Sequence, residues 1–246
     1  MKKPGPEIEY PRRRFIRAVL RGANHILFDL LTSLEVTGRE NLPEGGPLLL
    51  VINHFGFVDP AVVIRVTPWT LEMLGGFQMP NAPFVGSWIA KLWGYLPVHR
   101  GTGSRYALRA AESVLAQGGV VVIAPEGGAW ATVLRPPRPG TAFLAVRSGV
   151  PILPVGIDGA IDVFPSLAKG QRARVTVRIG KLFGPFRVEA RGRERRRQLD
   201  EIGHEIMQHI AELIPPERRG YYSDDPVIRA AAQGTEIYPW DEDSEI

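Results

Sequence analysis

A histidine and an aspartate stand five residues apart, as His54 and Asp59, after an apolar segment that leads into Asn53. Residues five apart on a regular helix point about 140° away from each other, so a helix would separate these two side chains. A turn at Gly56 would instead let the Asp59 carboxylate reach one imidazole nitrogen, which fixes the tautomer and leaves the other nitrogen to accept a proton. Such a pair is a general base for a hydroxyl. The alternative is that Asp59 caps a helix beginning at Pro60 and that His54 is a surface loop residue.

Short apolar segments alternate with helical patterns along most of the chain. Strands are predicted at Leu48–Asn53, Trp69–Leu74, Tyr95–Val98, Val120–Ala124, Ile152–Ile157 and Arg174–Ile179. Helices are predicted at Pro60–Val66, Pro83–Trp93, Ser104–Ala116, Thr141–Ser148 and Arg193–Ile214. This alternation is typical of an α/β fold with a mostly parallel central sheet and helices on both faces. Ligands bind outside the carboxyl ends of such strands, which is where His54 falls.

Ahead of the first predicted strand, Pro11–Leu34 has apolar residues at helical spacing and five arginines in its first half. The pattern predicts a basic amphipathic helix. Its apolar stripe would pack either on the core of the protein or on a membrane interface, and the residues alone leave both open.

Composition and charge exclude several classes of function. The 246 residues include no Cys, which excludes a disulfide framework, thiolate metal sites and a cysteine nucleophile. The net charge is +4, but seven acids against one base give residues 223–246 a charge of −6, which leaves +10 on residues 1–222. The basic excess at Lys2–Arg21 and Arg187–Arg197 favours a polyanionic partner. Because no RNA-recognition signature, zinc finger or stacking array accompanies these arginines, we predict no nucleic-acid partner.

Four sequence blocks follow one another along the chain: the NHxxxxD box Asn53–Asp59, Gly94–Gly101, Ala124–Gly128 and Pro151–Gly156. Together they resemble the glycerophospholipid acyltransferase family, whose best-known members are the 1-acylglycerol-3-phosphate (lysophosphatidic acid) acyltransferases. The resemblance covers residues 35–222, with a similar lead-in at Val36–Pro43 and a similar ending at Ile214–Tyr222.

The resemblance implies a definite chemistry. His54, held by Asp59, would deprotonate the hydroxyl of a lysophospholipid, most simply 1-acyl-sn-glycerol 3-phosphate. That hydroxyl would attack the thioester of acyl-CoA or acyl-carrier-protein, as co-substrate, to give phosphatidic acid. A covalent acyl-enzyme, a metal and a cofactor are not required, which agrees with the absence of Cys and of a Gly-x-Ser-x-Gly elbow.

The same resemblance assigns substrate-binding positions, which are Asn53, Arg100, Glu126, Gly127 and Pro154. Arg100 would hold the phosphate of the acceptor, a task that suits its fixed fork of donors. The alternatives are that Arg100 is a solvated arginine at a strand end and that Glu126 is a structural carboxylate bonding backbone amides.

One departure from the family concerns the third block. Family members commonly continue it with an arginine, whereas Gly128, Ala129 and Trp130 stand here. Either Arg135 or Arg138 would supply the missing charge, and we assign Arg138 to substrate binding. Otherwise the acceptor is less negatively charged than a phosphate monoester.

Two further groups of residues allow other interpretations. His204 and His209 resemble a zincin box with one residue too many, so we predict a helix surface and no metal site. A group of Met and aromatic side chains would form either core or a groove for an acyl chain; its members are Met73, Phe77, Met79, Phe84 and Trp88.

The predicted organisation is therefore an amphipathic membrane-docking helix (1–35), an acyltransferase domain (36–222) and an acidic mobile tail (223–246). We expect a peripheral, monotopic enzyme on the cytoplasmic face of the cell membrane, with arginines of the first helix facing anionic lipid. The alternatives are an acyltransferase for another lipid or glycolipid acceptor, a thioesterase-like hydrolase with the same His–Asp pair, and an inactive membrane-binding relative.

Overall fold

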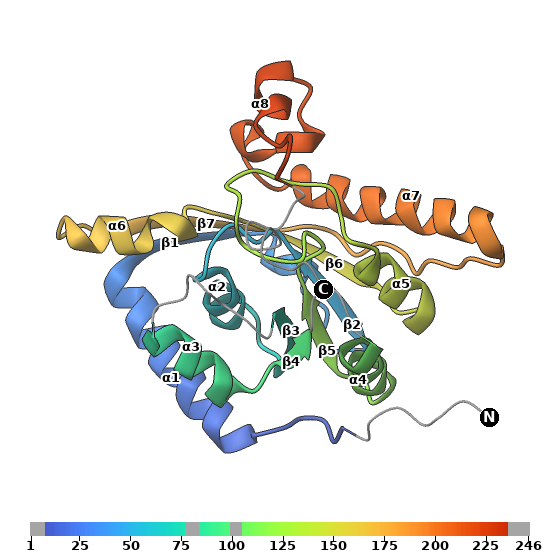
Figure 1. The fold of residues 1–246 in the computed structure, drawn as a ribbon. Coiled ribbons are helices and arrows are strands. Elements are labelled where there is room, and N and C mark those ends of the chain that lie inside the picture. The colour runs from blue at the N-terminus through green and yellow to red at the C-terminus, as the bar shows by residue number, and fades with distance from the viewer. Residues whose placement is uncertain (1–7, 77–83, 99–104, 236–246) are drawn as a thin grey trace, which may run out of the picture.

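A twisted sheet runs through the computed structural model, which describes residues 8–76, 84–98 and 105–235 (Figure 1). Its strands are β1 (Thr32–Thr37), β2 (Leu48–Ile52), β3 (Leu71–Gly76), β4 (Leu96–Val98), β5 (Val120–Ile123), β6 (Ile152–Asp158) and β7 (Ala173–Ile179). They lie in the order β1-β7-β6-β2-β5-β3-β4. Neighbouring strands are parallel except β6 and β7, which are antiparallel. The predicted mostly parallel α/β sheet is confirmed.

Helices cover both faces of this sheet, which is why β2 and β5 are apolar at every position. One face packs against α4 (Arg105–Ala116), α5 (Pro139–Ser148) and α7 (Gly192–Ala211). The other face packs against α1 (Arg14–Leu31), α2 (Asp59–Val66), the end of α3 (Phe84–Trp93) and the start of α6 (Val163–Ala168). The five residues of β2 are all buried, and this rigid centre fixes the position of the loop that carries His54.

Short elements complete the described chain. They are the 3-10 turns η1 (Arg39–Asn41), η2 (Ala160–Asp162), η3 (Pro216–Arg218) and η4 (Gly220–Tyr222), and the short helix α8 (Pro226–Ala230). Within the segment predicted as an acidic tail, α8 is helical, and the carbonyl of Thr235 accepts a hydrogen bond of 2.6 Å from Trp130 Nε1.

The prediction that the first helix extends to Leu34 was wrong. Helix α1 ends at Leu31, and Thr32 begins β1, which pairs in parallel with β7 along its whole length. The Thr32 hydroxyl donates to the carbonyl of Phe28 at 2.7 Å, which caps the end of the helix. Leu34 fits helical spacing and strand alternation equally well, and its strand partner, Val175, is too distant in sequence for local periodicity to reveal.

The other predicted elements are present with shifted ends. The largest shift among the strands is at β3, which begins at Leu71 rather than Trp69. The backbone carbonyls before it are taken by side chains: Tyr10 Oη donates to Thr70 at 2.6 Å, and Arg21 Nη2 donates to Trp69. Strand pairing therefore starts later than the apolar pattern suggests.

Most arginines of α1 and the residues before it bind the protein itself. Arg17 is 2% exposed and donates to both carboxylate oxygens of Glu72 in β3, at 2.6 and 2.9 Å. Arg12 also binds Glu72, and Arg13 Nη1 donates to the last carbonyls of α3. The expectation that the arginines face anionic lipid was wrong for Arg17, whose buried side chain fixes α1 to the sheet, and it stays a prediction for the exposed Arg13.

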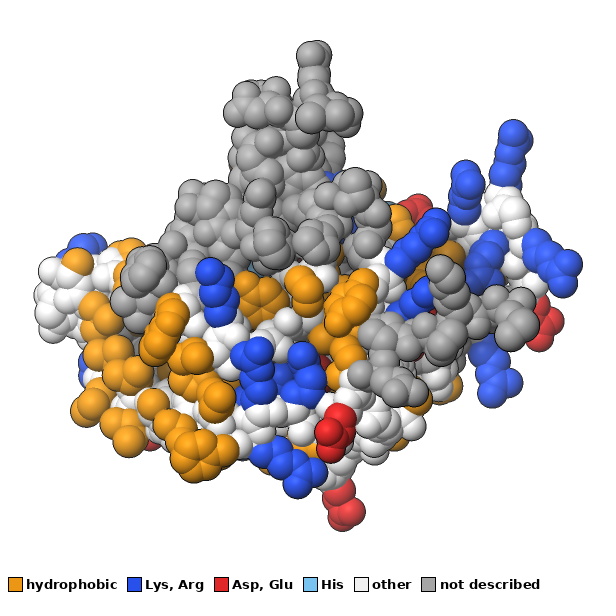
Figure 2. All heavy atoms as spheres, turned by 60° about the horizontal axis from the view of Figure 1, so that its bottom comes forward, with side chains coloured by type: hydrophobic (Ala, Val, Ile, Leu, Met, Phe, Trp, Pro, Cys, Tyr) orange, Lys and Arg blue, Asp and Glu red, His pale blue; other side chains and the backbone are white. Residues whose placement is uncertain are grey.

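The apolar stripe of α1 is divided between core and surface. Phe28 is buried, whereas six apolar residues of α1 are exposed, as are two of α3, which packs against α1. We call these eight the apolar face: Phe15, Ile16, Val19, Ile26, Leu27, Leu30, Trp88 and Ile89. Figure 2 shows hydrophobic side chains gathered at the lower left of the view, with Lys and Arg side chains beside them.

No helix in the described ranges is both long and apolar enough to cross a membrane. Of the predicted Met and aromatic group, Met73 is buried in the core and Trp88 is 58% exposed. Phe77, Met79 and the side chain of Phe84 lie outside what the structure describes.

Candidate active site

Asn53 continues the pairing of β2 with β6 beyond the last residue of the strand. Its Nδ2 donates to the carbonyl of Ile157 and its Oδ1 accepts from the N–H of Ile157, both at 2.8 Å. The residue is fully buried. The amide thus acts like a peptide group and holds the start of the loop 53–59 against the sheet. These are the contacts of a positioning residue, and substrate binding by Asn53 stays a prediction.

His54 and Asp59 are in contact because the chain turns back between β2 and α2. His54 Nδ1 lies 3.0 Å from Asp59 Oδ2, and the same oxygen accepts from the N–H groups of Phe55 and Gly56 at 2.8 Å. One carboxylate therefore fixes both the turn and the imidazole ring. The predicted turn at Gly56 is confirmed. The alternative capping role was wrong, because the Asp59 carboxylate turns back to the preceding loop and no side chain caps the N-terminus of α2.

Exposure differs sharply between the two members of this pair. The Asp59 side chain is 1% exposed and the His54 side chain 23%. With Nδ1 facing the buried carboxylate, Nε2 is the ring nitrogen left for a substrate. An imidazole whose Nδ1–H is bound by a carboxylate carries its lone pair on Nε2, which is the form a general base requires.

Glu126 follows β5 and holds the same loop from the neighbouring strand. Its Oε1 accepts from the backbone N–H of His54 at 2.9 Å, and the residue is 1% exposed. Burial raises the pKa of Glu126 to about 7, although the charge of Arg135 and the contacts with His54 act in the opposite direction. The structural alternative, a carboxylate that accepts from a backbone amide, is what the structure displays. Its predicted part in substrate binding remains a prediction.

Arg135, the first of the two candidate arginines, lies beside Glu126. Arg135 Nε lies 3.4 Å from Glu126 Oε2, and the guanidinium lies over the ring of Trp130, 3.6 Å from its centroid. The side chain is 1% exposed, so in this structure its charge acts on Glu126. The sequence did contain a signal for this position, because Trp130 provides an aromatic face on which a guanidinium can stack.

The remaining predicted site residues have different surroundings. Gly127 has a φ of 83°, a left-handed conformation that favours glycine and makes the tight turn after β5. Pro154 is buried within β6 opposite Val51, and Arg138 immediately precedes α5. Arg100 lies outside the described residues. Substrate binding by these four residues stays a prediction.

Tyr222, the last residue of the family-like ending Ile214–Tyr222, is a neighbour of the site that was not among the predicted site residues. Its hydroxyl lies 2.8 Å from His204 Nδ1. Burial is the main reason why the pKa of Tyr222 is raised, and the nearby carboxylates of Glu126 and Asp200 raise it further, so the phenol stays neutral. The end of the family-like segment therefore packs against α7 and lies near enough to Glu126 to feel its charge.

The two histidines of the apparent zincin box have separate neighbours. His204 contacts Tyr222, whereas the ring of His209 lies 4.0 Å from that of Phe183, measured between centroids. Among the residues that the structure describes, no group of three or more His, Asp and Glu side chains could hold a metal ion.

Comparison with known proteins gives two findings. A sequence profile described as Acyltransferase matches residues 33–158, just over half of the chain. Among solved structures, the 1-acyl-sn-glycerophosphate (LPA) acyltransferase PlsC from Thermotoga maritima is similar in fold, with a TM-score of 0.55 and 23% sequence identity over 79% of each chain. Both findings agree with the resemblance carried by the four sequence blocks.

Proposed function

Because the chain belongs to the acyltransferase family, we propose that it transfers a fatty acyl group from acyl-CoA or acyl-carrier-protein to the free hydroxyl of a lysophospholipid. The proposed acceptor is 1-acyl-sn-glycerol 3-phosphate and the product is phosphatidic acid. The observation that carries the proposal is the contact of 3.0 Å between His54 Nδ1 and Asp59 Oδ2.

The proposed reaction is a direct transfer. His54 Nε2 takes the proton of the acceptor hydroxyl as its oxygen attacks the thioester carbonyl carbon. The new C–O ester bond forms, the C–S bond breaks, and the leaving thiolate takes the proton from the imidazolium. Asp59 stabilises the imidazolium while this proton is held. Each residue is returned to its initial state, so a nucleophilic side chain is not needed.

Substrate contacts are proposed on both sides of His54. Arg100 would bind the phosphate of the acceptor, and Arg138 would add a second positive charge. Glu126 and Gly127 would shape the turn opposite the loop 53–59, and Asn53 and Pro154 would support that loop from the sheet. The hydrogen bond from the His54 N–H to Glu126 supports a role for Glu126 that is chiefly one of position.

A membrane surface is the proposed place of action, and the apolar face supports it. Phe15 is 82% exposed and Leu30 65%, and the ion pair between Arg17 and Glu72 holds α1 firmly against the sheet. A helix in the plane of an interface presents such a face to lipid. Because α1 is fixed, docking would set the orientation of the whole domain. We propose peripheral binding to the cytoplasmic face of the cell membrane on this basis.

Thiol release tests the proposal and separates transfer from hydrolysis. We expect release from acyl-CoA or acyl-carrier-protein to depend on added 1-acyl-sn-glycerol 3-phosphate and to yield phosphatidic acid. His54→Ala should abolish the reaction, whereas His209→Ala, a matched change on α7, should retain it. Equal release without an acceptor would indicate a thioesterase. Full transfer by His54→Ala would overturn the mechanism.

A panel of acceptors tests the finer assignment. With one acyl-CoA, lysophosphatidate should be the best substrate if the Arg100 region binds a phosphate monoester. A preference for an uncharged lysolipid or glycolipid would leave acyl transfer intact and contradict the assigned acceptor.

A further inference from the structure

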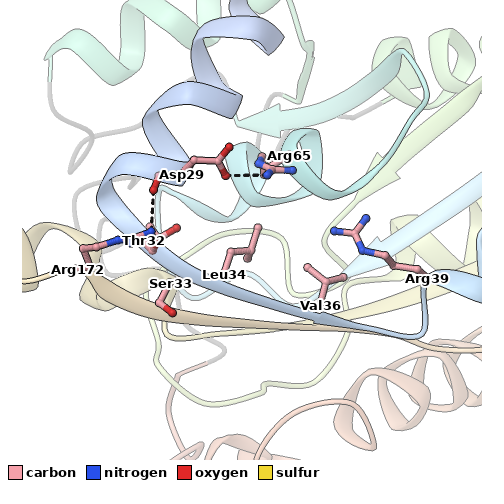
Figure 3. Close-up of a pocket in the computed structure, with 8 residues that line it drawn as sticks. All are labelled: Asp29, Thr32, Ser33, Leu34, Val36, Arg39, Arg65 and Arg172. Carbon is pink, nitrogen blue, oxygen red and sulfur yellow. Dashed lines mark hydrogen bonds and ion pairs between the residues drawn. The ribbon is translucent and has the colours of Figure 1, made fainter.

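A hollow of about 490 Å³ lies between the end of α1, strand β1, the end of α2 and the start of β7 (Figure 3). It includes none of the candidate active-site residues. Four charged side chains line it, Asp29, Arg39, Arg65 and Arg172, and β1 forms one wall. Three cations against one anion give this hollow a net charge of +2 if all four are ionised.

The three arginines differ in how far their donors are used. Arg172 Nη2 donates to the backbone carbonyls of Asp29 and Thr32, and so holds the end of α1. Arg65 Nη2 donates to Asp29 Oδ1 at 2.7 Å, but its Nε is buried and has no hydrogen-bond partner in the described part of the chain. Arg172 therefore has a structural role at the end of α1. Arg65 uses one donor to bind Asp29, and its Nε is left for a ligand.

Arg39 has no such task. It makes neither a side-chain hydrogen bond nor an ion pair with any residue that the structure describes, although it lines the hollow. In Figure 3 its side chain extends from η1, which follows β1, toward α2, which carries Arg65. Both guanidinium groups thus line the same hollow, and an anion bound there would reduce the repulsion between them.

Asp29 does not neutralise this pair. The hydrogen bond from Arg65 is the main reason why the pKa of Asp29 is lowered, so the carboxylate stays ionised and offsets a single charge. The excess of two positive charges matches a phosphate monoester, which carries about −1.5 to −2 at neutral pH. The fork of guanidinium donors also fits phosphate oxygens in pairs.

We propose that this hollow is a second anion site, separate from the active site, that binds the phosphate group of a ligand through Arg39 and Arg65. The phosphate group would belong to a lipid headgroup or to a soluble phosphate. The surroundings suit a headgroup, because Asp29 lies in the last turn of α1 between Ile26 and Leu30, which are 64% and 65% exposed and belong to the apolar face.

Site-resolved arginine modification tests the proposal on the full chain. The modification rate by phenylglyoxal at Arg39, measured by mass spectrometry, would be compared with that at Arg196 on α7. Arg196 is also exposed and without a side-chain partner among the described residues. The probes are inorganic phosphate and dihexanoyl phosphatidic acid, each against chloride at equal ionic strength.

We expect a probe at ten times its Kd to slow modification of Arg39 about tenfold and to leave Arg196 unchanged, since modification follows the unoccupied fraction. Protection by both probes supports a site for which the phosphate group suffices. Protection by the lipid alone supports a headgroup site. If neither probe changes the rate at which phenylglyoxal modifies Arg39, the proposal is overturned.

A matched pair of variants gives a second readout. Arg39→Glu should weaken binding of the protecting probe by about tenfold or more, because it replaces charge-assisted hydrogen bonds with repulsion. Arg196→Glu makes the same charge change and should leave the affinity unchanged. If Arg39→Glu binds the protecting probe as tightly as the wild type does, the proposal is contradicted. Because neither readout uses acyl transfer, an inactive chain with a protected Arg39 would contradict the proposed function and still support this site.

Discussion

The backbone N–H of His54 donates to the Oε1 atom of Glu126 over 2.9 Å, although 72 residues separate them. The contact is possible because β2 and β5 are adjacent and parallel, with Val51 opposite Ile123. The third sequence block therefore positions the first. Glu126 holds the backbone of His54 and Asp59 holds its imidazole ring. The position of the residue beyond the end of β2 and the orientation of its ring are therefore both fixed.

Glu126 should make the stability of the protein depend on pH. Its pKa rises from an ordinary value of 4.5 to about 7 on burial, so the folded state holds a proton that the unfolded state has lost. The free energy of unfolding should then decrease as the pH rises from 4.5 to 7, by up to about 3 kcal/mol. Urea unfolding of the wild type and of Glu126→Gln at pH 5, 6 and 7 measures this decrease, which the variant should lack.

Two controls separate charge from position at this residue. Glu126→Gln keeps an oxygen for the His54 N–H, whereas Glu126→Ala does not, so the Gln variant should retain more acyl transfer than the Ala variant. Parallel pH profiles of stability for the wild type and Glu126→Gln would show that the carboxyl does not titrate in this range.

Asp59→Asn should reduce kcat for acyl transfer by roughly 10²- to 10⁴-fold, the range expected when general-base catalysis is lost. The amide keeps one oxygen for the loop but carries no charge to stabilise the imidazolium. Thiol release measures kcat, and thermal unfolding shows whether the turn survives. A folded Asp59→Asn variant with wild-type kcat would contradict the proposed role of the pair.

Local sequence was enough to make the His54–Asp59 contact possible, because a turn at Gly56 can bring the two side chains together, but it left the capping role of Asp59 open until the family resemblance was added. It was not enough for Arg135, whose position depends on how the loop after Gly127 folds back over Trp130. The edge strand β1 was missed for a similar reason, since its partner β7 begins about 140 residues later along the chain. The role of Glu72 was also hidden, because its partners Arg17 and Arg12 are 55 and 60 residues away in the sequence.

Glu72→Gln should destabilise the fold by about 3–5 kcal/mol, because it leaves the buried Arg17 guanidinium without its counter-charge. Burial acts to raise the pKa of Glu72, but hydrogen bonds from Arg17 and Arg12 outweigh it and lower the pKa. The contribution of the ionised Glu72 carboxylate to the free energy of unfolding is thus present above pH 4.5 and is lost as the pH falls below that value.

Glu112→Gln is the matched control for Glu72→Gln. Glu112 pairs with Arg147 at the surface, where the Arg147 side chain is 41% exposed. Loss of this surface ion pair should lower the free energy of unfolding by at most about 1 kcal/mol. Denaturant midpoints of the two variants at pH 7 measure the difference, and equal costs would mean that the pair of Arg17 and Glu72 does not anchor α1.

Val19→Asp tests whether the apolar face meets lipid. Val19 is 56% exposed on α1, so the change removes little packing and should leave the free energy of unfolding nearly unchanged. On an anionic vesicle it would lose a buried apolar side chain and add a repelled charge, so the partition coefficient should fall by roughly 10- to 100-fold. Co-sedimentation with vesicles containing phosphatidylglycerol measures this coefficient.

Val227→Asp is the matched control for this change, because Val227 is 78% exposed and lies on α8, far from α1 in Figure 1. It should bind vesicles like the wild type. Acyl transfer to a lysolipid dispersed below its micellar concentration should be unaffected in both variants, whereas transfer to a lysolipid in vesicles should fall only in Val19→Asp. Equal vesicle binding by the two variants would mean that α1 does not dock on lipid, and the apolar face would then need another partner.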